Sequence, residues 1–414
     1  MSRLTEFDAK ELLHPYGVRL PRYQRAEDPL SAAQAARELG PRVVLKALVP
    51  AHGRGKRGAV RFADGPGEAE GAARALLAMR VGGYPVTALL VEERLDVADE
   101  LYLALTFDEA LGAPCILASS SGGMDIEEVA RLEPQRLLKR ALNPFEGLKG
   151  YRARSLWAEL GFSGATLSRL EASSVSLGKA FFDLEATLIE VNPLVLTQEG
   201  EAVAAGVAMA VDDEALPRKP ELACRAEPGN DRAWRPLTEL ERRIAEIDRA
   251  DPYRGTARYT ELEGGDIGFL CGGGGGSLLS FDALLRYGGK PANYSECGGN
   301  PPARKVKGIV EGILSKPGVK GLFVCINITN NTQTDEVARG VKAAFEALGI
   351  GPQGFPAVVR LAGVGEEEAR KIFQGIGIEY YGEEVTMEDA ASRMVERMRE
   401  TYPGYGAKDE GRSR

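Results

Sequence analysis

The stretch that decides the fold class is Ile267 to Cys271 (IGFLC), which is followed by five glycines, Gly272 to Gly276. The apolar run has the length of a buried strand, and residues 277–286 after the glycines have helical spacing. Strand, loop and helix return in the same order at 321–348 and at 357–374. Strands that alternate with helices through short turns predict a doubly wound parallel sheet in the C-terminal part of this α/β protein.

Ligands of such sheets gather at the carboxyl ends of the strands, where the glycine run and the polar loop 327–334 fall. Glycines leave room for a ligand to approach the backbone, and the N-terminus of the following helix can hold an anion. A flexible connector is the alternative interpretation of the glycine run.

The N-terminal half has a different pattern. Its helices and strands indicate a largely antiparallel or mixed sheet. We expect helices from Thr5 and at 31–39 and 68–79, and strands at 43–49, 59–62, 88–92 and 101–107. Residues 212–259 are rich in charge and proline, with one helical stretch at 237–247, and indicate a domain connection.

Composition excludes several classes of protein. The 414 residues predict two or three domains. Acidic residues outnumber basic ones by 60 to 52, so we expect no nucleic-acid partner. The five cysteines form no CxxC pair, which argues against a zinc site or a disulfide framework. Since no apolar run approaches the roughly 18 residues of a membrane span and the N-terminus lacks a signal-peptide core, the expected location is the cytoplasm, without a membrane partner.

A candidate anion site lies early in the chain. Lys46 is inside an apolar strand, where a buried ammonium needs a phosphate or a carboxylate beside it. The basic loop that follows, Gly53-Arg54-Gly55-Lys56-Arg57-Gly58, offers backbone N–H groups and positive charge to a polyphosphate. The loop lacks the Gly-Lys-Ser/Thr ending of a Walker P-loop. Alternatively, Lys46 extends along the surface and the loop is a mobile basic turn.

A second candidate is the segment 188–194 (LIEVNPL). In a strand Glu190 and Asn192 face the same side, so a carboxylate and an amide oxygen stand together. Such oxygens suit Mg²⁺ bound to nucleotide phosphates. The alternative is a buried strand that ends at Pro193.

Glu92 and Glu100 lie at strand ends and could flank one cleft, or be ordinary surface charges. The two histidines offer little chemistry. His14 is expected to be structural, and His52 could touch phosphate. Neither has an Asp or Ser partner at a readable spacing, so a histidine nucleophile within this chain is not expected.

These motifs together resemble the β subunit of succinyl-CoA synthetase over about residues 5 to 400. The order is Lys46 with Gly-Arg-Gly-Lys, Leu-Val-Glu92, Glu100-Leu-Tyr, Ser121-Gly-Gly-Met-Asp-Ile-Glu, Glu190-Val-Asn192-Pro-Leu and Gly288-Gly-Lys-Pro-Ala-Asn293. The resemblance implies an ATP-grasp fold followed by a flavodoxin-like domain. The implied boundaries are 1–19 with 96–230 for the subdomain with the metal site, 20–95 for the small subdomain, 240–402 for the flavodoxin-like domain and 403–414 for a disordered tail.

The resemblance also implies a reaction, in which ATP or GTP phosphorylates a histidine of an α-like partner, an acyl phosphate forms, and CoA, held mostly by the partner, displaces phosphate. It implies Asn192 as a Mg²⁺ ligand and Glu190 as the residue near the phosphohistidine. The implied nucleotide-binding residues are Lys46, Gly53, Arg54, Gly55, Glu92 and Glu100.

The sequence departs from the family in two places. Gly206 stands where the family has a second metal-binding aspartate, and Ala208 where it has a lysine. In the C-terminal part, the segments around Gly272 and Asn330-Asn331-Thr332 are closer to ATP-citrate lyase, whose citrate-contacting arginine matches Leu361 here, beside Arg360.

Two hypotheses remain. The chain is a working subunit that activates a small di- or tricarboxylate or hydroxy acid, or it is a nucleotide-deficient regulatory or scaffolding paralogue, to which Gly206 and Ala208 would point.

Overall fold

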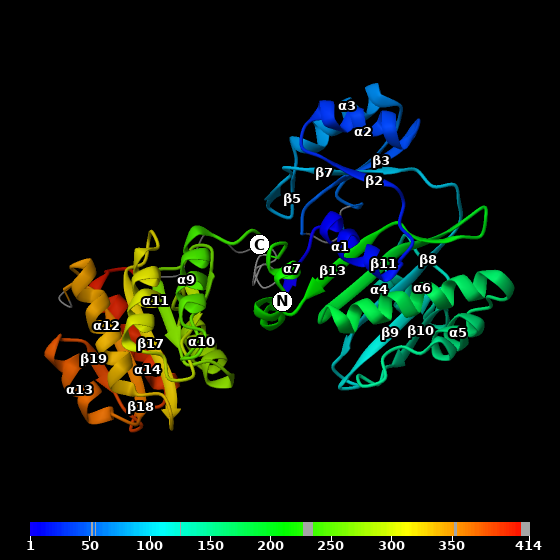
Figure 1. The fold of residues 1–414 in the computed structure, drawn as a ribbon. Helices are drawn as coiled ribbons and strands as arrows, with labels where there is room; N and C mark the ends of the chain where they lie inside the picture. Colours follow the sequence, from blue (N-terminus) through cyan, green and yellow to red (C-terminus); the bar gives the residue numbers. More distant parts are fainter. Residues whose placement is uncertain (51–52, 54, 125, 227–234, 352–353, 407–414) are drawn as a thin grey trace. The chain divides into compact units, whose positions relative to one another are not determined.

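The computed structural model describes residues 1–50, 53, 55–124, 126–226, 235–351 and 354–406. The chain forms two compact units, Met1–Pro236 and Leu237–Arg414. The first unit contains two larger antiparallel sheets and a two-stranded one, and the second contains a mostly parallel sheet between helices (Figure 1).

The smaller sheet of the first unit is antiparallel throughout. Its order is β2 (Tyr23–Ala26), β7 (Leu89–Glu93), β3 (Arg42–Ala47) and β4 (Val60–Asp64). Helices α2 (Pro29–Leu39) and α3 (Pro66–Leu77) pack together over it, as the upper part of Figure 1 shows, and a short hairpin, β5 (Arg80–Val81) and β6 (Tyr84–Pro85), follows. The start of α2 is set by the sequence, because Asp28 and Ser31 form a capping box around Pro29.

The larger sheet is also antiparallel. Its order is β1 (Ser2–Arg3), β13 (Val207–Val211), β11 (Ala186–Thr197), β8 (Val97–Asp108), β9 (Ala113–Ser119) and β10 (Leu137–Ala141), with β12 (Ala202–Ala204) paired to β11. Helices α5 (Gly150–Glu159) and α6 (Gly164–Asp183) bury their apolar sides in its core. The buried indole of Trp157 donates to Ser174 Oγ at 2.8 Å, which satisfies the one polar atom that α5 places there.

Shorter elements complete the first unit. Helix α1 (Glu6–Leu13) follows Thr5 as its N-cap, whose hydroxyl accepts from the Asp8 amide, as expected from the sequence. The others are η1 (His14–Tyr16), α4 (Ile126–Leu132), η2 (Pro134–Arg136), η3 (Asp213–Arg218) and α7 (Pro220–Ala223).

The second unit confirms the predicted doubly wound sheet. Its strand order is β14 (Arg258–Glu261), β16 (Asn293–Glu296), β15 (Ile267–Cys271), β17 (Gly321–Thr329), β18 (Ala357–Gly363) and β19 (Glu379–Tyr381). Only β14 is antiparallel to its neighbour. The five parallel strands have the 2-1-3-4-5 order of flavodoxin-like folds, with the reversal between β15 and β17.

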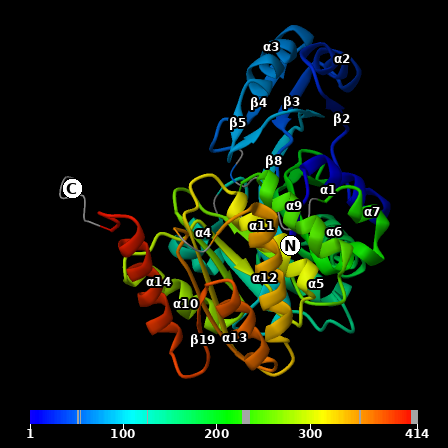
Figure 2. The same ribbon diagram turned by 90° about the vertical axis from the view of Figure 1, so that its left-hand side faces the viewer.

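Helices cover both faces of this sheet, as Figure 2 shows. On one face α10 (Gly275–Arg286) and α14 (Met387–Thr401) enclose a core with Phe269 and Phe323. On the other, α9 (Glu239–Ala250), α11 (Ala303–Ser315), α12 (Thr334–Leu348) and α13 (Glu366–Gly375) enclose a second core. The five-glycine run joins β15 to α10, as the sequence indicated.

Several expected boundaries move by a few residues. Helix α2 begins at Pro29 rather than at residue 31, and α9 runs from Glu239 to Ala250 rather than over 237–247, because capping boxes at Asp28 and Thr238 set their starts. Of the expected tail 403–414, residues 407–414 lie outside the described part of the chain.

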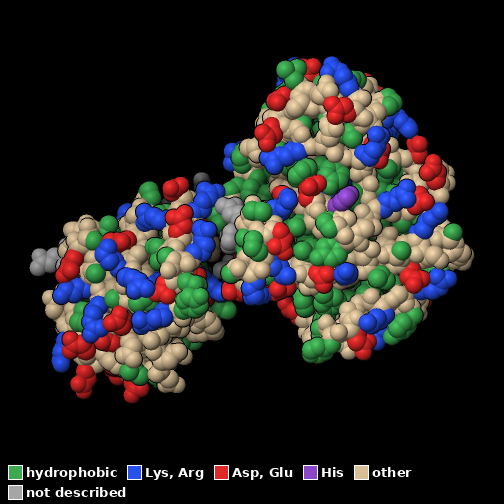
Figure 3. All heavy atoms as spheres, viewed as in Figure 1, with side chains coloured by type: hydrophobic (Ala, Val, Ile, Leu, Met, Phe, Trp, Pro, Cys, Tyr) green, Lys and Arg blue, Asp and Glu red, His purple; other side chains and the backbone are tan. Residues whose placement is uncertain are grey.

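Among the described helices, none combines the length and the apolar character needed to cross a membrane. Basic and acidic side chains are interspersed on the face drawn in Figure 3. The five cysteines are free thiols, four of them buried.

Candidate functional site

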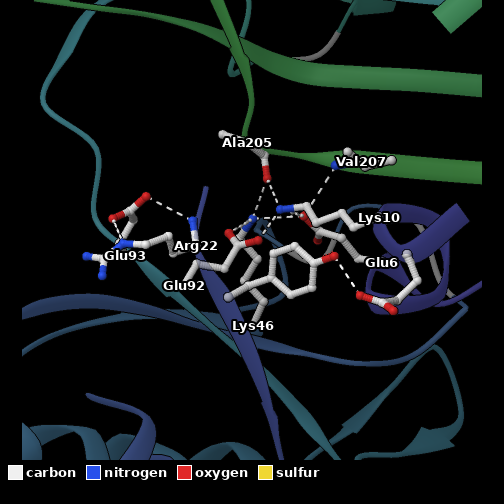
Figure 4. A network of polar contacts seen from close by, with 10 residues as sticks. Glu6, Lys10, Arg22, Lys46, Glu92, Glu93, Ala205 and Val207 are labelled. Atoms are coloured by element: carbon white, nitrogen blue, oxygen red, sulfur yellow. Dashed lines mark hydrogen bonds and ion pairs between the residues drawn. The ribbon is translucent and has the colours of Figure 1, made fainter. Parts of the chain in front are cut away.

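Lys46 lies in a buried cluster of four charged side chains, Glu6, Lys10, Lys46 and Glu92, which we call the charge tetrad (Figure 4). Lys46 Nζ is 2.9 Å from Glu6 Oε1 and 2.6 Å from Glu92 Oε2. Lys10 Nζ is 3.3 Å from Glu6 Oε1 and forms an ion pair with Glu92. Two carboxylates of the chain itself therefore meet the ammonium that the sequence places in an apolar strand.

Local structure brings the tetrad together. Glu6 and Lys10 are one turn apart on α1 and so share a helix face. On the small sheet Glu92 pairs with Val44, which puts Lys46, two residues further along β3, diagonally beside it on the same face. Residues about 40 and 80 positions apart in the chain thus meet.

Burial of the four side chains changes the pKa values of the two lysines. The side chains of Lys10 and Glu6 are 0% and 1% exposed, and that of Lys46 is 12% exposed. Burial lowers the pKa of Lys10, although the charge of Glu92 acts against it. At Lys46 burial also acts to lower the pKa, but the charges of Glu6 and Glu92 outweigh it and the pKa is raised. The Lys46 ammonium therefore stays charged at neutral pH.

The tetrad ties the small sheet to the large one through the backbone of the turn between β12 and β13. The Ala205 carbonyl accepts from Lys46 Nζ at 2.8 Å and from Lys10 Nζ at 2.9 Å. The Val207 amide donates to Glu6 Oε1 at 3.3 Å. The nucleotide lysine expected from the sequence is thereby joined to the turn that carries Gly206.

Gly206 lies against the backbone of β11. Its carbonyl accepts from the Asn192 amide at 2.8 Å, and its own amide donates to the Pro193 carbonyl at 3.3 Å. A Cβ built on Gly206 would overlap the Asn192 carbonyl. The pairing of this turn with β11 therefore leaves no room for a side chain at position 206 unless the backbone shifts.

We expect Gly206→Ala and Gly206→Asp to destabilise the first unit by a similar amount, about 1–3 kcal/mol, because both add the same overlapping Cβ. Chemical denaturation of each variant would measure this loss. Tighter Mg²⁺ binding by Gly206→Asp without loss of stability would contradict the expectation. Gly71→Ala on α3 is the control, because a Cβ there meets no atom within 4 Å and the backbone is helical.

The side-chain amide of Asn192 is hydrogen-bonded to the loop after β9. Asn192 Oδ1 accepts from the Gly123 amide at 2.7 Å, and its Nδ2 donates to the Met124 carbonyl at 3.0 Å. The Gly122 amide donates to the Glu100 carbonyl at 2.7 Å. A Cβ on Gly123 would overlap the carboxylate of Glu100, which is exposed. The two glycines thus allow the loop to bring Glu100 and Asn192 to the same place.

Glu190 is half-buried on β11, between Ala104 of β8 and Ala208 of β13. The position at which the family has a lysine is therefore the direct cross-strand neighbour of Glu190. Burial, with the nearby charge of Glu190, raises the pKa of Tyr102 on β8, so its phenol stays protonated.

The basic loop is exposed from Gly55 to Gly58. Gly53 and Gly58 have φ values of +64° and +68°, which favour glycine over other residues. The Arg57 amide donates to the Gly53 carbonyl at 3.2 Å. Arg54 and His52 lie outside the described residues, and His14 is exposed at the end of α1.

The predicted acid-binding residues lie at the carboxyl edge of the second unit's sheet. Gly272 follows β15, while Asn330, Asn331 and Thr332 follow β17, so both segments flank the point where the strand order reverses. Asn330 and Asn331 are exposed, but Thr332 is buried. The Thr332 hydroxyl accepts from the Asn300 amide at 3.1 Å, and therefore joins this loop to the loop after β16.

Sequence reasoning missed Glu6, Lys10 and the Ala205 carbonyl. Glu6 and Lys10 could have been found from the sequence, because they lie on the same face of α1 as the buried residues Ala9 and Leu13. A glutamate and a lysine four residues apart on a buried face indicate a buried ion pair.

Comparisons with known proteins agree with this architecture. The ATP-grasp domain family matches residues 3–196, and the family described as ATP citrate lyase citrate-binding matches residues 235–396. The fold resembles that of ATP citrate lyase from Methanothrix soehngenii, with a TM-score of 0.76 at 21% identity over 96% of this chain and 100% of that chain. The chain is therefore an ATP-grasp protein with a flavodoxin-like C-terminal domain.

Two relatives are more similar to this chain in sequence than that ATP citrate lyase is. The β subunit of the ADP-forming succinate–CoA ligase from Pyrobaculum calidifontis is 38% identical over 95% of this chain and 99% of its own length. The β subunit of the GDP-forming succinate–CoA ligase from Thermus thermophilus is 38% identical over 95% of this chain and 98% of its own length. The chain belongs to the succinate–CoA ligase β-subunit family.

Proposed function

We propose that this chain is the nucleotide-using β subunit of an ADP- or GDP-forming carboxylate–CoA ligase. The observation that carries the proposal is the meeting of Lys46 and Glu92, from the small sheet, with the Ala205 turn beside the strand of Glu190 and Asn192. Candidate groups for phosphate, metal and phosphoryl transfer thus come together from both sheets of the first unit.

The nucleotide, ATP or GTP, is proposed to lie between these two sheets. Lys46 and the backbone amides of the basic loop would bind phosphate oxygens, since ammonium and N–H groups are the donors that anions need. Glu92 and Glu100 would accept from the nucleotide's hydroxyl or amino groups. The proposed nucleotide-binding residues are Lys46, Gly53, Arg54, Gly55, Glu92 and Glu100.

The site also fits Mg²⁺. Asn192 Oδ1 accepts one hydrogen bond from Gly123 and keeps a second lone pair, and Glu190 projects a carboxylate from the same side of β11. When bound, Mg²⁺ would neutralise phosphate charge. Among the described residues no group of three His, Cys, Asp or Glu side chains is placed to hold a metal ion, so water would complete the coordination.

We propose that the nucleophile comes from a partner, because neither histidine of this chain has an Asp or Ser partner at a readable spacing in the sequence. In the proposed series of reaction steps, a histidine of an α-like partner subunit first takes the terminal phosphoryl group, and the nucleoside diphosphate leaves. A substrate carboxylate then takes the phosphoryl group from histidine, and the CoA thiol displaces inorganic phosphate to form the thioester. Glu190 would orient the visiting histidine.

The carboxylic acid is proposed to bind at the carboxyl edge of the second unit's sheet, near Gly272 and the loop Asn330-Asn331-Thr332. The match to a citrate-binding family supports a small di- or tricarboxylate. Exposed Asn330 and Asn331 can donate to a hydroxyl or an additional carboxylate, so we propose that a hydroxylated or tricarboxylic acid is preferred to succinate. CoA would be held mostly by the partner.

We expect Asn330→Ala to reduce the preference for the hydroxylated or tricarboxylic acid over succinate by about tenfold, the effect of one or two lost hydrogen bonds. Thr332→Val should instead cost about 1–3 kcal/mol of stability, because it leaves the Asn300 amide without its acceptor. Steady-state kinetics with both acids and thermal unfolding would separate these effects. Succinate as the best substrate of the wild type would refute the proposed preference.

The function is tested in two steps. Calorimetry of the isolated chain should show binding of Mg²⁺·ATP or Mg²⁺·GTP; binding of neither would favour the nucleotide-deficient alternative. With the α-like subunit of the same organism added, labelled γ-phosphate should appear on the partner's histidine. Asn192→Ala should reduce that transfer about 100-fold if the amide serves the metal. CoA-thioester formation by the isolated chain would contradict the division of labour between the subunits.

A further inference from the structure

A half-buried glutamate, Glu296, lies beside the glycine run at the carboxyl edge of the second unit's sheet. It is the last residue of β16 and pairs with Cys271, the last residue of β15. Because the glycine run follows Cys271 directly, it begins where both strands end. A Cβ built on Gly273 would lie 3.8 Å from the carboxylate carbon of Glu296. The carboxylate therefore lies against the backbone of the glycine run.

The loop that follows Glu296 contacts both parts of the proposed acid site. A Cβ built on Gly298 would overlap the Gly272 carbonyl, so the two backbones are in close contact. The Asn300 amide donates to the Thr332 hydroxyl at 3.1 Å. These contacts hold the loop against the ends of β15 and β17. Glu296 thus belongs to the same group of loops as the residues to which we assign the acid.

Among the described residues, no lysine or arginine forms an ion pair with Glu296. Its hydrogen bond comes from the Tyr294 hydroxyl, which donates to Oε1 at 2.8 Å. Burial of Tyr294, together with this hydrogen bond, raises the pKa of the phenol, which therefore remains a donor. The described residues provide no donor for Oε2 of Glu296. A half-buried carboxylate with acceptor positions to spare favours a ligand group that donates a hydrogen bond.

The negative charge of Glu296 decides which substrate group can lie beside it. A substrate carboxylate there would meet a like charge, whereas a hydroxyl is neutral and can donate. The substrate's carboxylates have donors elsewhere on the same edge. These are the first backbone amides of α10, which have no acceptor within the helix, and the side-chain amides of Asn330 and Asn331. Glu296 therefore distinguishes between two polar groups that amides alone would accept equally.

We infer that Glu296 is a specificity-determining residue that accepts a hydrogen bond from a hydroxyl of the substrate, so that the substrate is a hydroxy acid. The inference rests on the proposed function, because it places the acid at this edge of the sheet. Between a hydroxylated and a tricarboxylic acid, the selected feature is then the hydroxyl rather than the additional carboxylate.

The test is steady-state kinetics of CoA-thioester formation by the full chain with its α-like partner, on two pairs of acids. Succinate and malate differ only in a hydroxyl, and tricarballylate and citrate differ in the same group. The wild type should prefer the hydroxylated member of each pair. Glu296→Gln keeps the size of the side chain and should lower both kcat/KM ratios about tenfold, the effect of a weakened hydrogen bond to a charged group. It should also raise the use of tricarballylate relative to succinate about tenfold, because the repulsion is removed.

Two further variants separate contact with the substrate from a structural role. Glu311→Gln alters a glutamate of α11 that pairs with Lys307 at 2.6 Å, and it should leave both ratios unchanged. Tyr294→Phe removes the hydrogen bond to Glu296 but keeps the charge of the carboxylate, and it should retain the preference for the hydroxylated acids.

Two results would overturn the inference: ratios that Glu296→Gln leaves unchanged, or an equal fall of the ratios in Glu296→Gln and Tyr294→Phe. The second would show that the hydrogen bond between the two side chains matters, rather than contact with the substrate. Failure of the wild type and its partner to form a thioester with any of the four acids would instead count against the proposed function.

Discussion

Lys10→Met is expected to destabilise the first unit by about 3–5 kcal/mol, as for other buried ion pairs that lose one partner. The side chain of Lys10 is fully buried, and its ammonium contacts Glu6, Glu92 and the Ala205 carbonyl. Methionine has a similar length, so the substitution leaves little cavity and removes mainly the charge. The tetrad would then hold two carboxylates against one ammonium, and equilibrium denaturation would report the cost.

The matched control is the double variant Lys10→Met with Glu92→Gln, which returns the cluster to neutrality. It should recover a large part of the lost stability, because the penalty comes from the uncompensated carboxylate more than from the missing lysine. A single variant as stable as the wild type would show that water reaches the cluster. No recovery in the double variant would show that the Lys10 hydrogen bond to Ala205 dominates instead.

Lys46→Met is expected to weaken Mg²⁺·nucleotide binding about 100-fold. A charge-assisted hydrogen bond to phosphate contributes about 1.5–3 kcal/mol, and the variant also leaves a net negative charge beside the phosphates. Calorimetry would give the affinity, and denaturation the stability. Lys46 is more exposed than Lys10, 12% against 0%, so its loss should cost less stability than that of Lys10.

Lys46→Arg is the control that keeps the charge. It should bind nucleotide better than Lys46→Met, although the larger guanidinium must share the space of the tetrad. Nucleotide affinity unchanged by Lys46→Met would remove this residue from the proposed site and leave it a purely structural partner of Glu6 and Glu92.

Local sequence patterns predicted most of the strands and helices that form the core of the second unit. The apolar run at 267–271, the glycines after it and the repeated strand and helix spacing are short-range signals, and the resulting parallel sheet follows them closely. Helices α11 and α14 and strand β16 were not expected, although the sheet needs them. Parallel pairing joins residues far apart in the chain, and the sequence does not state which strands become neighbours.

In the first unit, an antiparallel or mixed sheet and a strand at 188–194 were expected, but the other elements after β8 were not. Strands β9 and β10 and helices α5 and α6 were missed. In β10 and α5 polar residues interrupt the apolar ones, and the tertiary structure satisfies buried polar groups, as Trp157 and Ser174 do for each other. The start of α1 was expected from Thr5, because capping depends on residues only a few positions apart, but the starts that capping boxes give α2 and α9 were not.

The sequence by itself determined the kinds of chemical group that this protein offers: a lysine in an apolar strand, a basic glycine loop, a carboxylate and an amide two residues apart, and a polar loop after a buried strand. It also showed that Gly206 and Ala208 depart from the family. These are properties of residues and their near neighbours, and they need no knowledge of distant contacts.

Only the tertiary structure decided what these groups meet. It paired Lys46 with Glu6 and Glu92, and it buried Thr332 while leaving Asn330 exposed. Strand register and helix packing fix such encounters between residues up to about 200 positions apart. Whether a buried charge is compensated depends on those distant partners, because electrostatic energy in a low-dielectric interior is set by the nearest opposite charge rather than by sequence.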